Sequence, residues 1–575
     1  MSALAAEVAK IGDTSYETLD AAVEAVASDQ QIELVDDAEL TVGYIKKPVT
    51  INGAGHVVSV PNQGNTGDGD GRLEIHSVLT FNNATVKFDN AKGWSLVMSK
   101  EGVLNLNQGA DCSFTNNGIY MYNGATINAD ASKLTVDHCK YTGIMGEKYG
   151  LVNATNGSLL TITNNSRGDG VANGVASVKL SVQDSELVVD GNENQGLVRA
   201  PLSLSNSTAS ISGNDIGITG YSGTDVLVME KGSKLTVADN KGAGIFLWGG
   251  KVDVQSGCEL SITGTGKNSS YTRFDSDNAD YYGALVTNGK TPERGTVTFA
   301  DGADVTITNN PLGGINNKET VSLGNNTVVT NNGGERVPNG GGISNNGGVI
   351  TVAKGAQVYN NHAEDAGDDV ANLNGGSLTL AATGSGWQLD DCDHAITGWF
   401  DDASDARWNA HDKDADVHVD EVAAAAFTDD VYLKAAHGLA TVDYKWVSTE
   451  NPSGVNPPAA DENLEFGSAY TAKAQDKAAG WTFDGWYVDE ACTTKWNDGA
   501  ALPGSMTLYG KWTKNVDPTP APNPDPTPKT PEQTASKVAK KAVPKTGDPA
   551  SVACIAAAAI AGGSALLAAK KMRRK

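Results

Sequence analysis

The sequence predicts an all-β protein: a parallel β-helix solenoid, followed by a small β-rich module, a Pro-rich linker and one C-terminal transmembrane helix. The solenoid is indicated by a phrase that recurs between residues 70 and 375, in which an apolar β-residue is followed by one spacer and then by Asn, Asp or Gly. Its instances begin at Phe114, Val136, Ile162, Val189, Ile211, Val237, Ile262, Ile307, Val329 and Val358. Successive instances are 22 to 29 residues apart, except for one step of 45, and a period in the twenties indicates a solenoid.

The residue types between these phrases decide which solenoid is expected. A leucine-rich repeat needs several Leu at fixed offsets, whereas these units carry Val, Ile and Thr in short runs that Gly and Asn separate. We therefore expect three short strands per turn, with inward apolar side chains stacked on their equivalents one turn away. Asn at the bends tolerates a left-handed backbone and hydrogen-bonds its neighbours, so the recurrent Asn is interpreted as structural rather than as ligand-binding. The Asn residues concerned are Asn164, Asn165, Asn214, Asn240, Asn309 and Asn310.

In this periodicity and residue type, residues 30 to 400 resemble the pectin-lyase-like right-handed β-helix of bacterial adhesins and polysaccharide-active enzymes. The resemblance implies a right-handed coil and leaves both binding and glycan cleavage open. A hydrolase needs two or three carboxylates facing one groove, and a lyase needs an acidic Ca²⁺-binding cluster with a nearby Arg or Lys base. Acidic pairs occur at Asp368/Asp369, Asp390/Asp391 and Asp401/Asp402. Because they fall at the C-terminal end of the coil or beyond it, they are interpreted as solvated surface, and no catalytic residue is predicted.

A short amphipathic helix is expected ahead of the coil. Leu19, Val23 and Val26 recur at helical spacing. They follow the pattern Thr14-x-x-Glu17, which is typical of a capping box at a helix N-terminus.

The one irregular step of the repeat predicts a ligand-binding loop. Between Ile262 and Ile307 the step is 45 residues, and the excess, from Lys267 to Tyr282, interleaves aromatic with acidic residues. Such side chains can stack on sugars and hold their hydroxyl groups, and insertions on a rigid coil tend to carry function. The alternative, an additional irregular turn with a polar loop, is favoured over a binding role. The candidate ligand residues are Tyr271, Arg273, Phe274, Asp275, Tyr281 and Tyr282.

Aromatic residues become frequent beyond the coil and predict a separate module. Trp94 and Trp248 are the only tryptophans before residue 380, whereas the other eight lie between Trp387 and Trp512. Residues 481 to 512 resemble the internalin B-type repeat through Phe483, Gly485, Trp486, Tyr487, Trp496, Leu508, Tyr509, Lys511 and Trp512. The resemblance implies a small β-rich module used as a spacer or as a protein contact. We expect its tryptophans to form the module core.

Three features follow one another at the C-terminus. Residues 551–569 carry no charge and, at about 1.5 Å per helical residue, just span a hydrocarbon core. A tail at 570–575 with five Lys and Arg residues comes next and is expected to stay on the cytoplasmic side. Ahead of the span stands Val543-Pro544-Lys545-Thr546-Gly547. This order resembles the sorting signal of sortase-anchored proteins of Gram-positive bacteria, although the family motif begins with Leu where this chain has Val543.

That resemblance implies a covalent route to the cell wall. In the family a sortase cysteine attacks the amide that corresponds to Thr546–Gly547 and passes the threonyl group to a peptidoglycan precursor. Before this step the helix would hold the protein in the plasma membrane. Alternating Pro in residues 514–542 favours polyproline II, which suits a spacer across the wall. Ala3-Leu4-Ala5-Ala6 looks like the end of a signal peptide, so a remnant is expected at the N-terminus.

Composition excludes several classes of partner. A formal net charge of −26 argues against nucleic acid, because phosphate-backbone binding needs clustered Lys and Arg. The six cysteines are widely spaced without a Cys-x-x-Cys pair, so neither a disulfide scaffold nor a zinc site is predicted. No cofactor and no metal are expected.

These elements give an expected order along the chain. The segments are a signal-peptide remnant (1–12), the N-terminal cap and β-helix (13–400), an acidic connector (401–440), the internalin B-type module (441–513), the Pro-rich wall spacer (514–542), the sorting motif (543–547), the transmembrane helix (551–569) and the cytoplasmic tail (570–575). We expect a secreted, peptidoglycan-anchored adhesin or interaction scaffold, without catalytic activity, that binds a host or microbial glycan or protein. The rival is a polysaccharide lyase or glycoside hydrolase displayed on the wall.

Overall fold

A computed structural model describes residues 7–515 except 62–71, 90–92, 267–282, 290–293, 391–393, 404–416, 419–420, 448–449, 466 and 476. The chain divides into two compact units, Met1–Asn515 and Val516–Lys575. Only the first unit is described, so the expected linker, sorting motif, transmembrane helix and basic tail lie outside the described residues. Among the residues that are described, no helix has the length and apolar character needed to cross a membrane.

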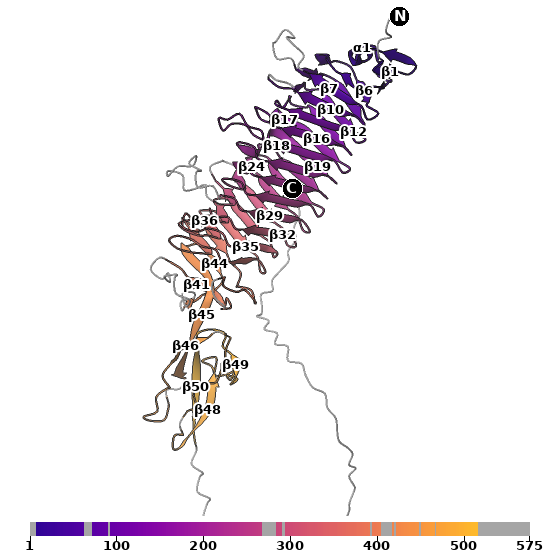
Figure 1. Ribbon diagram of the computed structural model, residues 1–575. Coiled ribbons are helices and arrows are strands. Elements are labelled where there is room, and N and C mark those ends of the chain that lie inside the picture. Colours follow the sequence, from indigo (N-terminus) through magenta and orange to yellow (C-terminus); the bar gives the residue numbers. More distant parts are fainter. Residues whose placement is uncertain are drawn as a thin grey trace, which may run out of the picture. The chain divides into compact units, whose positions relative to one another are not determined.

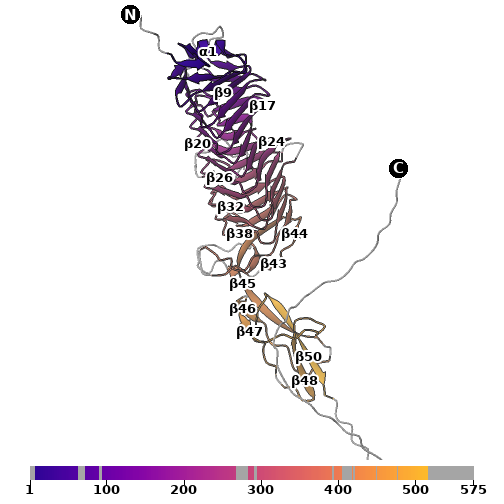
Figure 2. The ribbon, with the colours of Figure 1, turned by 90° about the vertical axis from the view of Figure 1, so that its right-hand side faces the viewer.

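Most of the described chain is a parallel β-solenoid of the right-handed type, as the sequence predicts. One turn runs through β13 (Asp111–Thr115), β14 (Ile119–Met121) and β15 (Thr126–Asp130), and β16 (Lys133–Asp137) then returns beside β13. The three strands of each turn belong to three faces, which we call faces 1, 2 and 3 in that order. Figures 1 and 2 show successive turns stacked along one axis, with α1 at the N-terminal end.

The faces contain the following strands. Face 1 holds β4 (Ala38–Glu39), β7 (Val57–Pro61), β10 (Thr85–Asp89), β13, β16, β18 (Leu159–Thr163), β20 (Glu186–Asp190), β23 (Thr208–Ser212), β26 (Lys234–Ala238), β29 (Glu259–Thr263), β32 (Asp304–Thr308), β35 (Thr327–Thr330) and β38 (Gln357–Tyr359). Face 2 holds β5 (Tyr44–Ile45), β8 (Leu73–Ile75), β11 (Leu96–Met98), β14, β21 (Gln195–Val198), β24 (Ile216–Tyr221), β27 (Ile245–Trp248), β30 (Leu285–Thr287), β33 (Ile315–Asn317), β36 (Ile343–Asn346) and β39 (Val370–Leu373). Face 3 holds β3 (Ile32–Leu34), β6 (Val49–Asn52), β9 (Val78–Asn82), β12 (Val103–Asn107), β15, β22 (Leu202–Ser205), β25 (Asp225–Glu230), β28 (Lys251–Val254), β31 (Thr296–Phe299), β34 (Thr320–Leu323), β37 (Val349–Val352) and β40 (Ser377–Thr379). The long strands β17 (Ile144–Thr155) and β19 (Val175–Gln183) run through faces 2 and 3.

The recurring phrase of the sequence forms the inner side of face 1. Phe114 pairs with Val136, which pairs with Ile162, and all three are fully buried. The expected stacking of equivalent apolar side chains is therefore confirmed. Across the irregular step, Ile262 pairs directly with Ile307, so the step contains one turn. The favoured expectation of an additional turn is wrong, and the excess residues are an insertion between β29 and β30.

A ladder of buried asparagines crosses the turns at the end of face 1. The Nδ2 of Asn165 donates to Oδ1 of Asn192 at 2.7 Å, Asn192 to Asn214 at 2.9 Å, and Asn214 to Asn240 at 3.2 Å. A second run of the ladder contains Asn310, Asn332 and Asn361. Each amide oxygen also accepts the backbone N–H of the preceding Asn, so both ends of the buried side chain are satisfied.

The residues around this ladder explain the rest of the phrase. The residue before each ladder Asn is Asn, Asp or Gly and takes the left-handed backbone, with φ of 53° at Asn164 and 57° at Asn309, as expected for Asn at a bend. Glycines lie against the ladder: a Cβ at Gly174 would stand 3.0 Å from Nδ2 of Asn192, too close for most side chains. The structural interpretation of the recurrent Asn is therefore confirmed.

A second buried column precedes the face 1 strands. The backbone N–H of Ser158 donates to Oγ of Ser185, Ser185 to Ser207, and Ser207 to Ser233, at 3.1 to 3.3 Å. Cys258 is buried at the next turn of the same column, since its neighbour Glu259 pairs with Lys234. This cysteine acts as a small buried hydrophobe, as expected.

The N-terminal end is closed by a short helix and a hairpin. The helix, α1, spans Leu19–Ala25, and its N-cap is Thr18, whose Oγ1 accepts the N–H of Ala21 at 3.2 Å. The predicted capping box at Thr14 is wrong, because Thr14 begins β2 (Thr14–Tyr16), which pairs with β1 (Ala9–Ile11). A residue in a strand has an extended backbone, so Thr14 cannot cap the helix. The helix therefore begins about one turn later than predicted, at Leu19.

The C-terminal end of the coil is covered by five strands. These are β41 (Gly398–Asp401), β42 (Val417–His418), β43 (Glu421–Val422), β44 (Ala426–Phe427) and β45 (Val431–Trp446). Of these, β42 pairs parallel with β45, and the other pairings within this cap and with the coil are antiparallel. The first half of β45 pairs antiparallel with β39 and β41. Its second half pairs with β46 and β50, so one strand belongs both to the cap and to the module, and it runs through the position expected to divide connector from module (Figure 1).

The module after residue 440 is small and β-rich. Its other strands are β46 (Asp461–Glu465), β47 (Ala469–Tyr470), β48 (Trp481–Tyr487), β49 (Ala500–Ala501) and β50 (Met506–Lys514). The rings of Trp446 and Trp486 stack with centroids 5.4 Å apart. Both lie over Gly510, where any Cβ would clash with them. The tryptophans therefore form the core of the module, as expected.

We predict that Asn214→Ala lowers the free energy of unfolding by about 1–3 kcal/mol, because it removes the acceptor of the buried Asn192 N–H and Nδ2 groups. Urea unfolding followed by circular dichroism measures the change. Ser210→Ala in β23, the strand that ends just before Asn214, is the matched control, because Ser210 points outward, and it should stay within about 0.5 kcal/mol of the parent. Equal effects of the two variants would contradict a stabilising ladder.

Candidate functional site

The residues singled out from the sequence fall mostly outside the described residues. This applies to the sorting motif Val543, Pro544, Lys545, Thr546 and Gly547, and to the loop residues Tyr271, Arg273, Phe274, Asp275, Tyr281 and Tyr282. The acidic pairs are the exception, because five of their six residues, all but Asp391, lie among the described residues and can be compared with the expectation.

Three of these carboxylates are buried, which corrects their interpretation as solvated surface. Asp369 is fully buried and ends the asparagine ladder: its Oδ1 accepts from Asn361 Nδ2 at 2.9 Å, and its Oδ2 accepts the N–H of Ala435 in β45 at 2.8 Å. Asp402 is also buried and accepts the N–H of Asp368. The carboxylates accept hydrogen bonds from the backbone and from Asn361 at the end of the coil. The spacing of the acidic residues in the sequence does not reveal that acceptors are needed there.

The same cluster contains two further charged groups. Lys434 Nζ lies 3.3 Å from Oδ2 of the buried Asp368. His362 Nε2 lies 3.5 Å from Asp390, whose side chain is exposed as expected. Burial raises the pKa of Asp369 to about 7, and the hydrogen bond to Asp390 raises the pKa of His362. These groups tie the cap to the coil.

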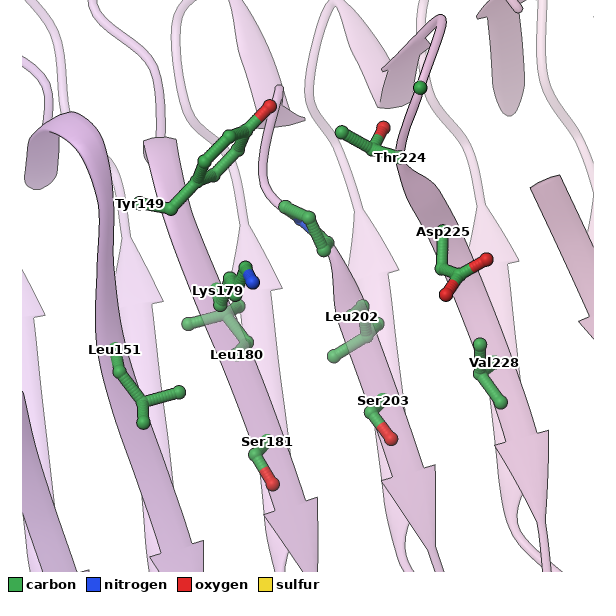
Figure 3. A pocket seen from close by; sticks show the side chains of 12 residues that line it. Tyr149, Leu151, Lys179, Leu180, Ser181, Leu202, Ser203, Thr224, Asp225 and Val228 are labelled. Carbon is green, nitrogen blue, oxygen red and sulfur yellow. The ribbon is translucent and has the colours of Figure 1, made fainter. Parts of the chain in front are cut away.

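One hollow of the described surface lies at the corner between faces 2 and 3. This corner groove has a volume of about 450 Å³ and crosses four successive turns, those of β17, β19, β22 and β25. Figure 3 shows Tyr149 and Thr224 at one end of the groove and Ser181 and Ser203 farther along the strands. Asp225 is the one carboxylate among the residues that line it.

The backbone at this corner is unusual. Tyr149 has a φ of 67° and Arg199, in the bend between β21 and β22, a φ of 49°. The left-handed region costs a bulky residue about 1–2 kcal/mol, whereas most left-handed positions of this coil hold Asn, Asp or Gly. Gln108, His138 and Lys231 are left-handed elsewhere in the coil, so this strain by itself does not single out the corner.

Each of these two residues takes part in a cation–π pair. Lys179 Nζ lies 5.7 Å from the ring centroid of Tyr149, and the guanidinium carbon of Arg199 lies 4.4 Å from that of Tyr221. Both cations are exposed. Neither forms an ion pair with any residue that the structure describes. The tyrosine faces therefore hold the two positive charges in place. Lys179 lines the groove, whereas Arg199 lies two residues before the lining residue Pro201.

Further aromatic residues border face 2 beside the groove. The ring of Trp94 lies 5.5 Å from that of Tyr120 and 6.0 Å from that of Tyr141. Trp94, Tyr141 and Met145 line a smaller hollow of about 170 Å³, over which Arg167 reaches to the ring of Tyr141. Tyr141 is 40% exposed and Met145 is 37% exposed, so this apolar strip is open to solvent.

Sequence reasoning missed the corner groove and the strip. Trp94 stood out as one of two tryptophans before residue 380, but nothing placed it beside Tyr120 and Tyr141. The register of face 1 could have done so, because a residue's distance from the recurring phrase determines the strand and the side on which it lies. Exposed rings, short hydroxyl side chains and unpaired cations form a surface suited to binding a polar ligand with apolar faces.

Comparisons with known proteins add little to this description. No family model and no solved structure matches the chain. A stretch of 71 residues is 37% identical to a protein of Evansella cellulosilytica described as "Putative Gly-rich membrane protein". The match covers 12% of this chain and 8% of that protein, so the chain spans a small fraction of its relative.

The buried cluster at the coil end predicts a pH dependence of stability. An unfolded Asp ionises near pH 4, but folded Asp369 does so near pH 7, so its contribution to stability is complete below about pH 4 and is lost as the pH rises through about 7. His362 contributes with the same sign. The fold lowers the pKa of other carboxylates, such as Asp137 and Asp461. These carboxylates make the stability depend on pH only below about pH 4.

We therefore expect a higher thermal midpoint at about pH 5 than at about pH 8, measured by scanning calorimetry. Asp369→Asn keeps the oxygen that Asn361 needs and does not titrate, so it should flatten the difference whatever its own stability. A variant with the parent's full pH dependence would show that Asp369 is not its source.

Proposed function

We propose that this protein is a secreted, wall-anchored surface protein whose β-helix binds an extracellular ligand. The observation that carries the proposal is the order of the last residues: a motif at 543–547, an uncharged stretch at 551–569 and a basic tail at 570–575. A sortase joins the carbonyl of Thr546 to a peptidoglycan precursor after cleaving the bond to Gly547. The Pro-rich residues 514–542 then act as the spacer across the wall.

The coil supports the binding part of the proposal. A solenoid whose interior is held by hydrogen-bonded ladders offers a firm, extended outer surface, and ligand-binding residues are most effective on such a scaffold. The corner groove and the aromatic strip beside it supply exposed rings, hydroxyl groups and cations on neighbouring turns. The function is therefore adhesion or scaffolding by contact with a glycan or a protein outside the cell.

The anchoring step predicts the behaviour of Thr546→Ala. In the native Gram-positive host this variant should leave the peptidoglycan-linked fraction and accumulate in the membrane fraction, because the bond that sortase cleaves is no longer recognised. Immunoblots of muramidase-released material measure the distribution. Thr519→Ala in the Pro-rich segment is the matched control and should stay on the wall. An unchanged wall fraction for Thr546→Ala would refute sortase anchoring.

The rival, a glycan-cleaving enzyme, makes a different prediction. Glycoside hydrolysis normally requires a pair of carboxylates across one groove, and Asp225 has no second carboxylate among the lining residues. We expect no new reducing ends and no unsaturated products when the chain up to Asn515 is incubated with plant and host polysaccharides. Product formation that Asp225→Asn abolishes would replace binding by catalysis as the function of the groove.

A further inference from the structure

We propose that the side chains of Lys434 and Asp368 react with each other to form an intramolecular amide bond. Lys434 lies in β45, the strand shared by the cap and the module, and Asp368 lies shortly before β39 in the last turn of the coil. The bond would join the cap to the coil covalently. It concerns buried residues of the described unit and is independent of the proposed anchoring and of any ligand on the outer surface.

The two reacting groups are held close together. Nζ of Lys434 lies 3.3 Å from Oδ2 of Asp368, and the two side chains are 12% and 6% exposed. Backbone hydrogen bonds fix both residues: Lys434 lies opposite Phe400 in β41, and the N–H of Asp368 donates to Asp402 at 2.7 Å. Because the groups are already in contact, the reaction is a unimolecular step, which lowers its barrier relative to an encounter in solution.

The carboxylate of Asp368 has the orientation that amide formation requires. One of its oxygens must leave as water, while the other remains as the carbonyl oxygen of the amide. Oδ2 faces the amine of Lys434, and Oδ1 accepts the backbone N–H of Ala363 at 2.9 Å. The same N–H would stabilise the negative charge that develops on Oδ1 when the amine adds to the carboxyl carbon.

The reaction needs no co-reactant. The ammonium group of Lys434 passes one proton to Oδ2 of Asp368, and the resulting neutral amine attacks Cγ. A second proton then moves from Nζ to Oδ2, the Cγ–Oδ2 bond breaks and one water molecule leaves. The products are a neutral amide between Nζ and Cγ, and water, and no group is oxidised or reduced.

Burial favours this product over an ion pair. Asp368, Asp369 and Asp402 are all buried in the cluster that contains Lys434. Removing charges from water is costly, and the attraction within a buried ion pair often fails to offset that cost. Amide formation removes one positive and one negative charge. Phe400, which is fully buried and lies directly opposite Lys434, is on the same side of the sheet and limits the access of water that would reverse the reaction.

The position of the bond suggests its use. β45 pairs with the last coil strand, β39, from Val431 to Leu433, and it continues into the module, where it pairs with β46 and β50. Lys434 is the residue that follows this contact with β39. An amide bond at Lys434 would therefore keep β45 on the end of the coil whenever the hydrogen bonds of the cap open.

The test is the mass of the full chain, produced in a host that lacks sortase and shown by circular dichroism to be folded. We expect a mass lower by one water molecule than that of the unmodified sequence, after allowance for removal of the initiator Met. Tryptic digestion should release one branched peptide, in which the segment that contains Asp368 is joined to an uncleaved Lys434. A folded preparation that has the full mass and that trypsin cleaves after Lys434 overturns the proposal.

Lys434→Arg is the decisive variant. Arginine keeps the positive charge beside Asp368, but its guanidinium stays protonated and does not attack a carboxyl group, so this variant should show the full mass of its sequence. Lys445→Arg, which changes an exposed lysine of the same strand, is the matched control and should lose water as the parent does. Loss of water from Lys434→Arg as well would place the reaction elsewhere in the chain and overturn the assignment.

Discussion

The coil depends on the hydrogen bonds between asparagines one turn apart. A buried amide must both donate and accept, and in this interior its partner is the identical group on the next turn. The ladder fixes the register of face 1 and, through the glycines packed against it, the position at which each chain segment enters face 2. Where Thr265 interrupts the column, its hydroxyl and backbone N–H both bond to Asn310, so the pattern continues across the irregular turn. At the last turn the carboxylate of Asp369 replaces the amide and bonds to β45 as well.

Because the interior determines the register, the outer surface is free to vary. Outward positions on neighbouring turns carry Leu151, Lys179 and Asp225 without any change in the inner columns. The buried ladders also stabilise the turns before and after Tyr149 and Arg199. The strained backbone at these two residues can therefore persist. The inward side chains of the strands therefore stabilise the coil, while the outward side chains of the same strands are available for recognition. This division explains how a shallow groove with unpaired cations persists on an acidic protein.

The periodicity of the sequence was enough to predict the coil, its face 1 residues and the structural use of Asn. These predictions succeeded because they depend on repeated local chemistry, which one chain shows many times. The helix cap at Thr18, the buried Asp369 and the single turn between Ile262 and Ile307 could not be predicted, because each is set by strand pairing that the residue pattern does not show: β1 with β2, β45 with the end of the coil, and β29 with β32. The corner groove was missed for a related reason: its side chains come from four turns, and their meeting depends on bends whose length varies from turn to turn.

The arrangement of β50 has a mechanical consequence. This strand is hydrogen-bonded on both sides, to the parallel β45 and to the antiparallel β48, and those bonds lie across the strand direction. Tension applied at Lys514 along the strand loads all of these bonds in shear at the same time, whereas a sideways pull would break them one after another. Because β45 continues into the cap of the coil, the load passes from strand to strand without crossing a loop. A chain held at one end and gripped at the other would thus resist extension through its backbone hydrogen bonds, much as overlapping fibres resist being drawn apart.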